Sequence, residues 1–331
     1  MAAIVLVRRF LAAAAIAAAA SLHAGMAFGH ESHRHRSEAP ERAAIVAADE
    51  AQSRHDFAKA QVLLDRQLAA RPDDVEARLM RANLRLLAGA FEDARSDCRS
   101  AMQAGAFYAG TICLASAQTG AGSIERARRM IAALGERDGA DIELLRWRLL
   151  TEADLASRAG EEASSRYLLE RAYALDPRHE EVRTQLAERV LNAGDAARAL
   201  ELARAPAPSV ARLVLRVRAA RALGAADATA SLGELVAMLD ADRSRGIPPH
   251  LREEAQLALH VYGDAAAALG LARLNFETQK DTPDLRMLAA SAVAASDAAA
   301  MAALRDWMRD TGFEDAAIKG TFTFTQVVES R

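Results

Sequence analysis

The apolar positions of the chain recur in a unit built from two small residues and a turn. An alanine stands seven positions before a glycine, and a second alanine follows that glycine by five positions. The complete pattern occurs at Ala82, Gly89 and Ala94; at Ala115, Gly122 and Ala127; and at Ala187, Gly194 and Ala199. Glycine can end a helix in the left-handed conformation, and alanine lets two helices cross closely. The pattern therefore predicts repeated helix–turn–helix units.

Weaker copies of the unit extend the array. Ala153 and Gly160 are followed by Ser165 in place of the second alanine, and Gly263 is followed by Ala268. Successive turn glycines, Gly224 included, lie 30 to 39 positions apart. Pro72 and Pro177 each stand where proline would stop the second helix of a unit. Few segments are rich in β-branched or aromatic residues, so we expect a nearly all-α protein.

These residues resemble the tetratricopeptide repeat (TPR) family, which repeats about every 34 residues as a helix–turn–helix. The matching residues are Ala82, Gly89 and Ala94; Ala115, Gly122 and Ala127; Ala153, Gly160 and Ala172; and Ala187, Gly194 and Ala199. The resemblance is strong over 41–213 and weaker over 214–316. It implies a right-handed α-solenoid of about six to eight TPR-like hairpins. A generic helical-hairpin solenoid is the alternative, because Arg85, Gln118, Ala156 and Val190 replace the bulky aromatic residue of the family.

The first 29 residues have the pattern of a secretory signal peptide. Arg8 and Arg9 precede an alanine-rich apolar run, and small residues follow it. Ala27 and Gly29 favour cleavage before His30, whereas Gly25 and Ala27 favour cleavage before Phe28. An uncleaved membrane anchor is the alternative. We therefore expect a periplasmic or secreted protein with no transmembrane span in the mature chain.

The C-terminal region departs from the repeat. Residues 305–320 predict a capping helix with Trp307 on its apolar side. Residues 317–331 are expected to form an extended tail, because Thr321, Thr323 and Thr325 alternate with apolar or amide residues. Such a tail would pack on the last helix pair, or it would add a strand to the sheet of a partner.

Composition limits the function classes. Apolar residues make up 51% of the 331 positions and aromatic residues only 5%, so alanine and leucine must form the core. The net charge of −3 leaves no basic excess for nucleic acid as the main partner. We found no zincin, nucleophile-elbow, phosphate-loop or Cys-x-x-Cys motif, so we expect no enzymatic activity. The oligomeric state is left open.

The two cysteines fall on helices that the repeat register makes neighbours. Cys98 lies in the second helix of one unit, and Cys113 lies in the first helix of the next. A disulfide is one interpretation, because an exported protein meets an oxidising compartment. Two buried thiols are the other.

A histidine-rich segment, 30–40, separates the signal from the repeats and is expected to be disordered. His30, His33 and His35 offer imidazoles that suit Cu or Zn. Weak metal binding is one hypothesis, and a solvated linker is the other, because Arg34 and Arg36 place positive charge beside any metal. No other cofactor is expected. His55 and His179 fall at or near turns, where we expect them to be exposed.

The resemblance also indicates where a ligand would bind. TPR proteins usually bind a protein or peptide in a concave groove lined by the first helix of each unit. The corresponding residues are Asn83, Ser116, Trp147, Asp154, Arg158, Glu188 and Asn192. We therefore expect a non-enzymatic protein- or peptide-binding scaffold of the cell envelope. The alternative is a metal-handling accessory protein that uses the N-terminal histidines.

Overall fold

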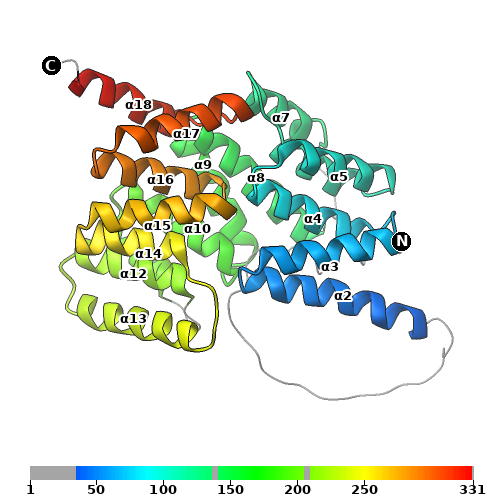
Figure 1. The fold of residues 1–331 in the computed structure, drawn as a ribbon, viewed down its shortest axis with the longest axis horizontal. Helices are drawn as coiled ribbons and strands as arrows, with labels where there is room; N and C mark the ends of the chain where they lie inside the picture. Colours follow the sequence, from blue (N-terminus) through cyan, green and yellow to red (C-terminus); the bar gives the residue numbers. More distant parts are fainter. Residues whose placement is uncertain (1–34, 136–140, 205–208, 330–331) are drawn as a thin grey trace.

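The computed structural model describes residues 35–135, 141–204 and 209–329, and within these ranges it is helical without any strand (Figure 1). In this described part, eight helical hairpins follow one another, and a single helix comes after them. The first four are α2 (His35–Ser53) with α3 (Phe57–Ala70), α4 (Val75–Leu87) with α5 (Phe91–Gln103), α6 (Phe107–Ser116) with α7 (Ser123–Ala132), and α8 (Ile142–Arg158) with α9 (Glu162–Leu175).

The next four hairpins continue the array without a break in architecture. They are α10 (Glu180–Asn192) with α11 (Ala196–Ala203), α12 (Val210–Ala222) with α13 (Ala228–Ser244), α14 (Leu251–Leu257) and the π-helical turn η1 (Ala258–Tyr262) with α15 (Ala265–Thr278), and α16 (Thr282–Ala294) with α17 (Ala298–Thr311). Helix α18 (Ala316–Glu329) ends the described chain. The expected all-α solenoid of helix–turn–helix repeats is confirmed.

Each hairpin turns at a residue in the left-handed region of the backbone. Six turns use the glycines identified in the sequence, such as Gly89 with φ 76° and Gly194 with φ 87°. The first and last hairpins turn instead at His55, φ 58°, and at Ser296, φ 53°. Residues other than glycine rarely adopt this backbone conformation. A search for turn glycines therefore finds the six middle hairpins and misses the outer two.

The small residues of the repeat lie where its two helices cross. The alanines seven positions before and five positions after the turn are fully buried in the hairpins of Gly89, Gly122 and Gly194; these are Ala82, Ala94, Ala115, Ala127, Ala187 and Ala199. The first hairpin repeats the arrangement with Ala48 and Ala60 around His55. The register of the repeat thus persists where its glycine is lost.

In α4, Arg85 stands where the resemblance to the TPR family implied a bulky aromatic residue. Arg85 reaches the carboxylate of Asp97 on α5, at 2.6 Å. Arg81 pairs with the same carboxylate at 2.7 Å, and Asp97 is only 1% exposed. A buried carboxylate held by guanidinium groups thus links these two helices.

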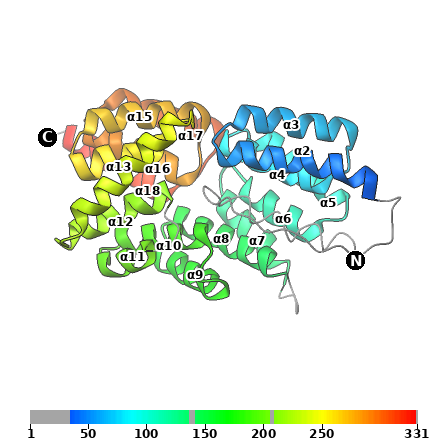
Figure 2. The ribbon, with the colours of Figure 1, turned by 90° about the horizontal axis from the view of Figure 1, so that it is seen from below.

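The C-terminal hairpins fold back onto the turns of the N-terminal ones (Figures 1 and 2). The backbone N–H of Gly120 donates to the carbonyl of Gly312 at 2.7 Å, and that of Lys280 donates to the carbonyl of Leu87 at 2.6 Å. The His55 and His250 rings meet edge to face with centroids 5.3 Å apart. We call this contact surface, between the turns at residues 55–160 and residues 250–316, the seam.

The segment Gly312–Asp315 makes both polar and apolar contacts in the seam. The Glu314 carboxylate accepts from the backbone N–H of Ser123 at 2.9 Å and from its hydroxyl at 2.8 Å. Arg158 Nε donates to the Glu314 carbonyl at 3.0 Å, and its guanidinium lies 4.2 Å from the centre of the Phe313 ring. Phe91 stacks on Phe313 with centroids 6.0 Å apart. The carboxylate satisfies free N–H groups at the start of α7, so the seam is polar as well as apolar.

The expectation of an extended tail at 317–331 is wrong over the described residues. The chain breaks at Gly312 and then forms α18, so the predicted capping helix is two helices. Asp315 caps α18 by accepting from the N–H of Ile318 at 3.0 Å. Ile318 and Phe322, four positions apart, pack on the C-terminal core. Helical burial of these two side chains outweighs the alternation of threonine and phenylalanine.

The close approach at Gly312 leads to a test of the seam. A Cβ at Gly312 would lie 2.5 Å from the backbone nitrogen of Gly120, whereas a Cβ at Gly263 meets nothing within 4 Å. Both glycines have φ 70°. Gly312→Ala and Gly263→Ala therefore incur the same backbone strain, and only Gly312→Ala incurs the clash. We expect Gly312→Ala to lower the free energy of unfolding in urea by about 1–3 kcal/mol more than Gly263→Ala. Equal losses would contradict a tightly packed seam.

Candidate functional site

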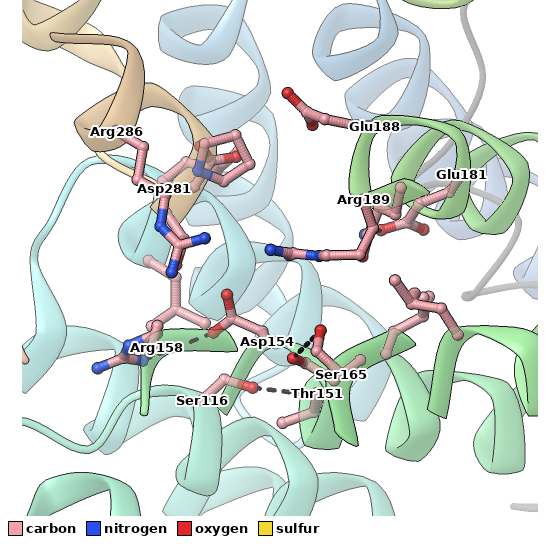
Figure 3. A pocket seen from close by; sticks show the side chains of 18 of the residues that line it. Ser116, Thr151, Asp154, Arg158, Ser165, Glu181, Glu188, Arg189, Asp281 and Arg286 are labelled. Carbon is pink, nitrogen blue, oxygen red and sulfur yellow. Dashed lines mark hydrogen bonds and ion pairs between the residues drawn. The ribbon is translucent and has the colours of Figure 1, made fainter. Parts of the chain in front are cut away.

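A chamber of about 580 Å³ lies between the two halves of the solenoid (Figure 3). The first helices of successive hairpins line it, and α16 and Phe313 contribute from the seam side. Apolar side chains such as Met80, Leu150 and Met287 share its surface with charged and amide groups. The fold-back therefore turns the inner face of the solenoid into a partly open pocket of the size used for small ligands.

All seven residues that the sequence indicated for the groove line this chamber. They are Asn83, Ser116, Trp147, Asp154, Arg158, Glu188 and Asn192. Four of them, namely Asn83, Ser116, Asp154 and Glu188, stand six positions before the turn glycine of their hairpin. A helix presents the same face at the same register position, so the repeat places these side chains side by side.

The same register position supplies lining residues that the sequence analysis missed. Arg218 stands six positions before Gly224, and Ala290 stands six before Ser296; both line the chamber. Extending the register beyond the strong repeats would have found Arg218. Ala290 was hidden because its hairpin turns at a serine.

The chamber wall carries the carboxyl of Glu181, at the start of α10. Figure 3 shows this side chain beside Arg189, on the other side of the chamber from Asp281, the residue that caps α16. Burial and the charge of Asp281 raise the pKa of Glu181 to about 7, and the nearby Arg146 opposes this shift. Glu181 thus changes its protonation near neutral pH.

The expectation that His55 and His179 are exposed is wrong. His55 is half-buried in the seam, and His179 is half-buried at the chamber wall. Burial and the charge of Arg146 lower the pKa of His179 to about 4, so its ring is neutral at pH 7. His179 Nδ1 faces the N–H of Val182 at 3.5 Å, which places the ring at the start of α10.

Two arginines at the chamber wall are held by the seam. Arg158 is 3% exposed and bonds the Glu314 carbonyl, with Asp154 3.6 Å away. Arg286 donates to the Asp315 carboxylate at 2.9 Å and to the Ser157 hydroxyl at 2.8 Å. Their guanidinium groups stabilise the fold-back, so they are less free to meet a ligand than the sequence suggested for Arg158.

Other lining groups keep their hydrogen-bonding or contact capacity. Within the described part of the chain, the Asn83 amide and the Trp147 indole N–H make no hydrogen bond to the protein. Ser116 makes only weak contacts, to the Ile112 carbonyl at 3.2 Å and to the Thr151 hydroxyl at 3.5 Å. These side chains can meet a ligand without breaking the fold.

Cys98 and Cys113 form a disulfide behind this wall, with their Cα atoms 5.5 Å apart. The bond joins α5 to α6, the packed neighbours that the repeat register indicated. Cys113 also lines the chamber. The disulfide ties two successive hairpins together beside the site.

The side chains of the predicted metal ligands lie outside the described residues. His30 and His33 are outside the described residues, and so is the side chain of His35. Among the residues that are described, no cluster of three or more His, Cys, Asp or Glu side chains is arranged to hold a metal ion. The described helices also include none long and apolar enough to span a membrane.

Comparison with known proteins adds little beyond this geometry. No family model matches the chain, and no curated protein matches it. Among solved structures, a thermophilic TPR protein of Thermus thermophilus aligns at 22% identity, with a TM-score of 0.42, over 55% of this chain and 98% of that one. The type IV pilus biogenesis factor PilW aligns at 18% identity, with a TM-score of 0.42, over 62% and 94%.

Two further solved structures align at similar levels. PilF of Pseudomonas aeruginosa gives 15% identity and a TM-score of 0.40 over 63% of this chain and 93% of its own. Yeast Tom70 gives 12% identity and a TM-score of 0.42 over 99% and 72%. The hairpin architecture described above therefore rests on the helices and turns of this chain.

The raised pKa of Glu181 predicts a pH-dependent stability. The carboxyl binds its proton more tightly in the folded chain, from a usual pKa of 4.5 to about 7. The stability that it contributes is complete below the unfolded pKa and is lost as the pH rises through 7. Glu181→Gln cannot ionise, so we expect it to exceed the wild-type free energy of unfolding by about 1–3 kcal/mol at pH 8, and not at pH 4.

The exposed Glu125, outside the chamber, provides the control for this measurement. Glu125→Gln should keep the wild-type dependence of unfolding free energy on pH. A Glu181→Gln profile parallel to wild type from pH 4 to 8 would show that burial does not raise the pKa of Glu181.

Proposed function

We propose that this protein is a non-enzymatic binding scaffold of the cell envelope that holds a segment of a protein or peptide partner in the chamber. One observation carries the proposal. A single register position of successive hairpins converges on one chamber, and side chains there retain unused hydrogen-bonding groups. Repeat proteins bind through such continuous inner surfaces, because each hairpin adds one side chain to the same face.

The chemistry of the wall suits a short peptide segment. The Asn83 amide both donates and accepts, as a peptide backbone requires, and Trp147 offers a large flat surface at low conformational cost. Met80, Leu150 and Met287 would cover apolar side chains of the segment. The chamber volume limits the occupant to a few residues, so the partner would insert a loop or a chain end.

The envelope location rests on two independent features. Residues 1–29 have the composition of a secretory signal. The disulfide of Cys98 and Cys113 requires an oxidising compartment in order to form and persist. Both features support export, and the bond would stabilise the N-terminal hairpins there.

The proposal predicts a loss of partner binding on changing the free chamber side chains. The double variant Asn83→Ala, Trp147→Ala removes the unused amide and the aromatic surface. We expect its recovery of cross-linked partner from envelope extract to fall at least tenfold, which is a loss of about 1.4 kcal/mol or more in binding. The measurement is quantitative mass spectrometry of proteins cross-linked to tagged full-length chain.

Tyr167→Ala is the matched control, since Tyr167 is 64% exposed and outside the chamber. It should recover the same partner as wild type. Circular dichroism must show equal helicity for all three proteins. Equal recovery by the chamber variant would reject the chamber as the site of partner binding.

A further inference from the structure

Arg218 lines the chamber, and among the described residues its guanidinium group hydrogen-bonds only to side-chain amides. Its guanidinium donates from Nη1 to Gln256 Oε1 at 3.0 Å and from Nη2 to Asn192 Oδ1 at 3.2 Å. No carboxylate of the described residues forms an ion pair with it. The charge of Glu188 acts on Arg218. Gln256 bridges the two, because its Nε2 also donates to Glu188 Oε1 at 3.4 Å. A guanidinium held by neutral amides retains its attraction for an anion.

The other basic side chains of the chamber already bind groups of the protein. Six basic side chains and four acidic ones line the chamber. Among the basic ones, Arg189 pairs with Glu162 at 2.8 Å, and Arg146 pairs with Glu143. Arg158 and Arg286 are held in the seam, and the Lys280 amine donates to a backbone carbonyl beside the Phe276 ring. Arg218 is therefore the chamber arginine whose charge is least neutralised.

A local departure from the repeat builds the surroundings of Arg218. The π-helical turn η1 inserts one residue before Gly263. In other hairpins, the small residue at the helix crossing stands seven positions before the turn glycine. Here Ala255, eight positions before Gly263, takes that place and is fully buried. Gln256 moves to the inward-facing position, and His260, inside the π-turn, also lines the chamber. Insertions of this kind are frequent at functional sites.

We propose that Arg218, Asn192 and Gln256 form a subsite for the carboxylate of a chamber ligand. The carboxylate would accept from Arg218 in the two-pronged geometry that guanidinium favours, with the Asn192 amide turned to donate to it. The inference deepens the proposed function, since it assumes that the chamber is where a ligand binds. The carboxylate would come from a free organic acid or from an acidic side chain of the bound segment.

His260 provides a direct readout. Burial and the positive charge of Arg218 lower the pKa of its imidazole to about 4. A carboxylate bound to Arg218 would offset that charge and raise the pKa of His260. The ring signals of His260, assigned by comparison with His260→Gln, can be followed by NMR in the full mature chain.

The experiment titrates the chain with sodium propionate, a mimic of the glutamate side chain, against equal sodium chloride. We expect propionate to raise the pKa of His260 by at least half a unit in a saturable manner. Arg218→Gln should abolish this response. Arg221→Gln, which changes an exposed arginine on the same helix, should retain it. If Arg218→Gln does not fold, Asn192→Ala serves as the second variant and should weaken the response.

Blocked tripeptides separate the two sources of carboxylate. If acetyl-Ala-Glu-Ala-amide raises the pKa of His260 as propionate does, and acetyl-Ala-Gln-Ala-amide does not, the subsite takes an acidic side chain. A shift with propionate alone would assign it to a free acid. No shift with any carboxylate, or an unchanged shift in Arg218→Gln, would overturn the inference. The proposed function would then still stand if the Asn83 and Trp147 variant loses its partner.

Discussion

The contact between the Gly312–Asp315 segment and the N-terminal hairpin turns determines the shape of the inner surface of this solenoid. Glu314 accepts hydrogen bonds at the start of α7, where backbone N–H groups have no partner inside the helix. The Gly120 and Gly312 backbones approach closely enough to bond each other. Without these contacts the inner surface of the hairpins would be an open groove. With them it is a chamber of defined size.

The seam also determines which polar side chains of the chamber wall already have partners within the protein. Arg158 and Arg286 stabilise the fold-back, so the chamber uses them as structural elements. Asn83 and Trp147 are left available. Glu181 lies in a poorly solvated position, and this burial, with a smaller effect of the Asp281 charge, raises its pKa to about 7. Residues that occupy equivalent positions in the repeat thus acquire different chemical roles from what the second half of the chain places opposite them.

The hairpin of α14 and α15 shows how a degenerate repeat can acquire a local specialisation. The π-turn keeps a small residue, Ala255, at the helix crossing and brings Gln256 and His260 to the chamber. The Gln256 amide then bridges Arg218 and Glu188. Departures from local regularity of this kind are expected at sites that bind ligands, because the packing around them must compensate for the lost regularity.

Local sequence determined the helix–turn–helix units and their register, because these depend on helical periodicity and on close crossing of adjacent helices. The resemblance to the TPR family then indicated the seven groove residues. Local sequence failed at His55 and Ser296, where tertiary packing tolerates a left-handed turn without glycine. It failed at 317–329, where burial of Ile318 and Phe322 selects a helix. Only the tertiary structure decided the seam, because Ser123 and Glu314 lie 191 positions apart and their pairing leaves no local pattern. The raised pKa of Glu181 and the amide partners of Arg218 also depend on packing between separate hairpins, which leaves no local pattern in the sequence.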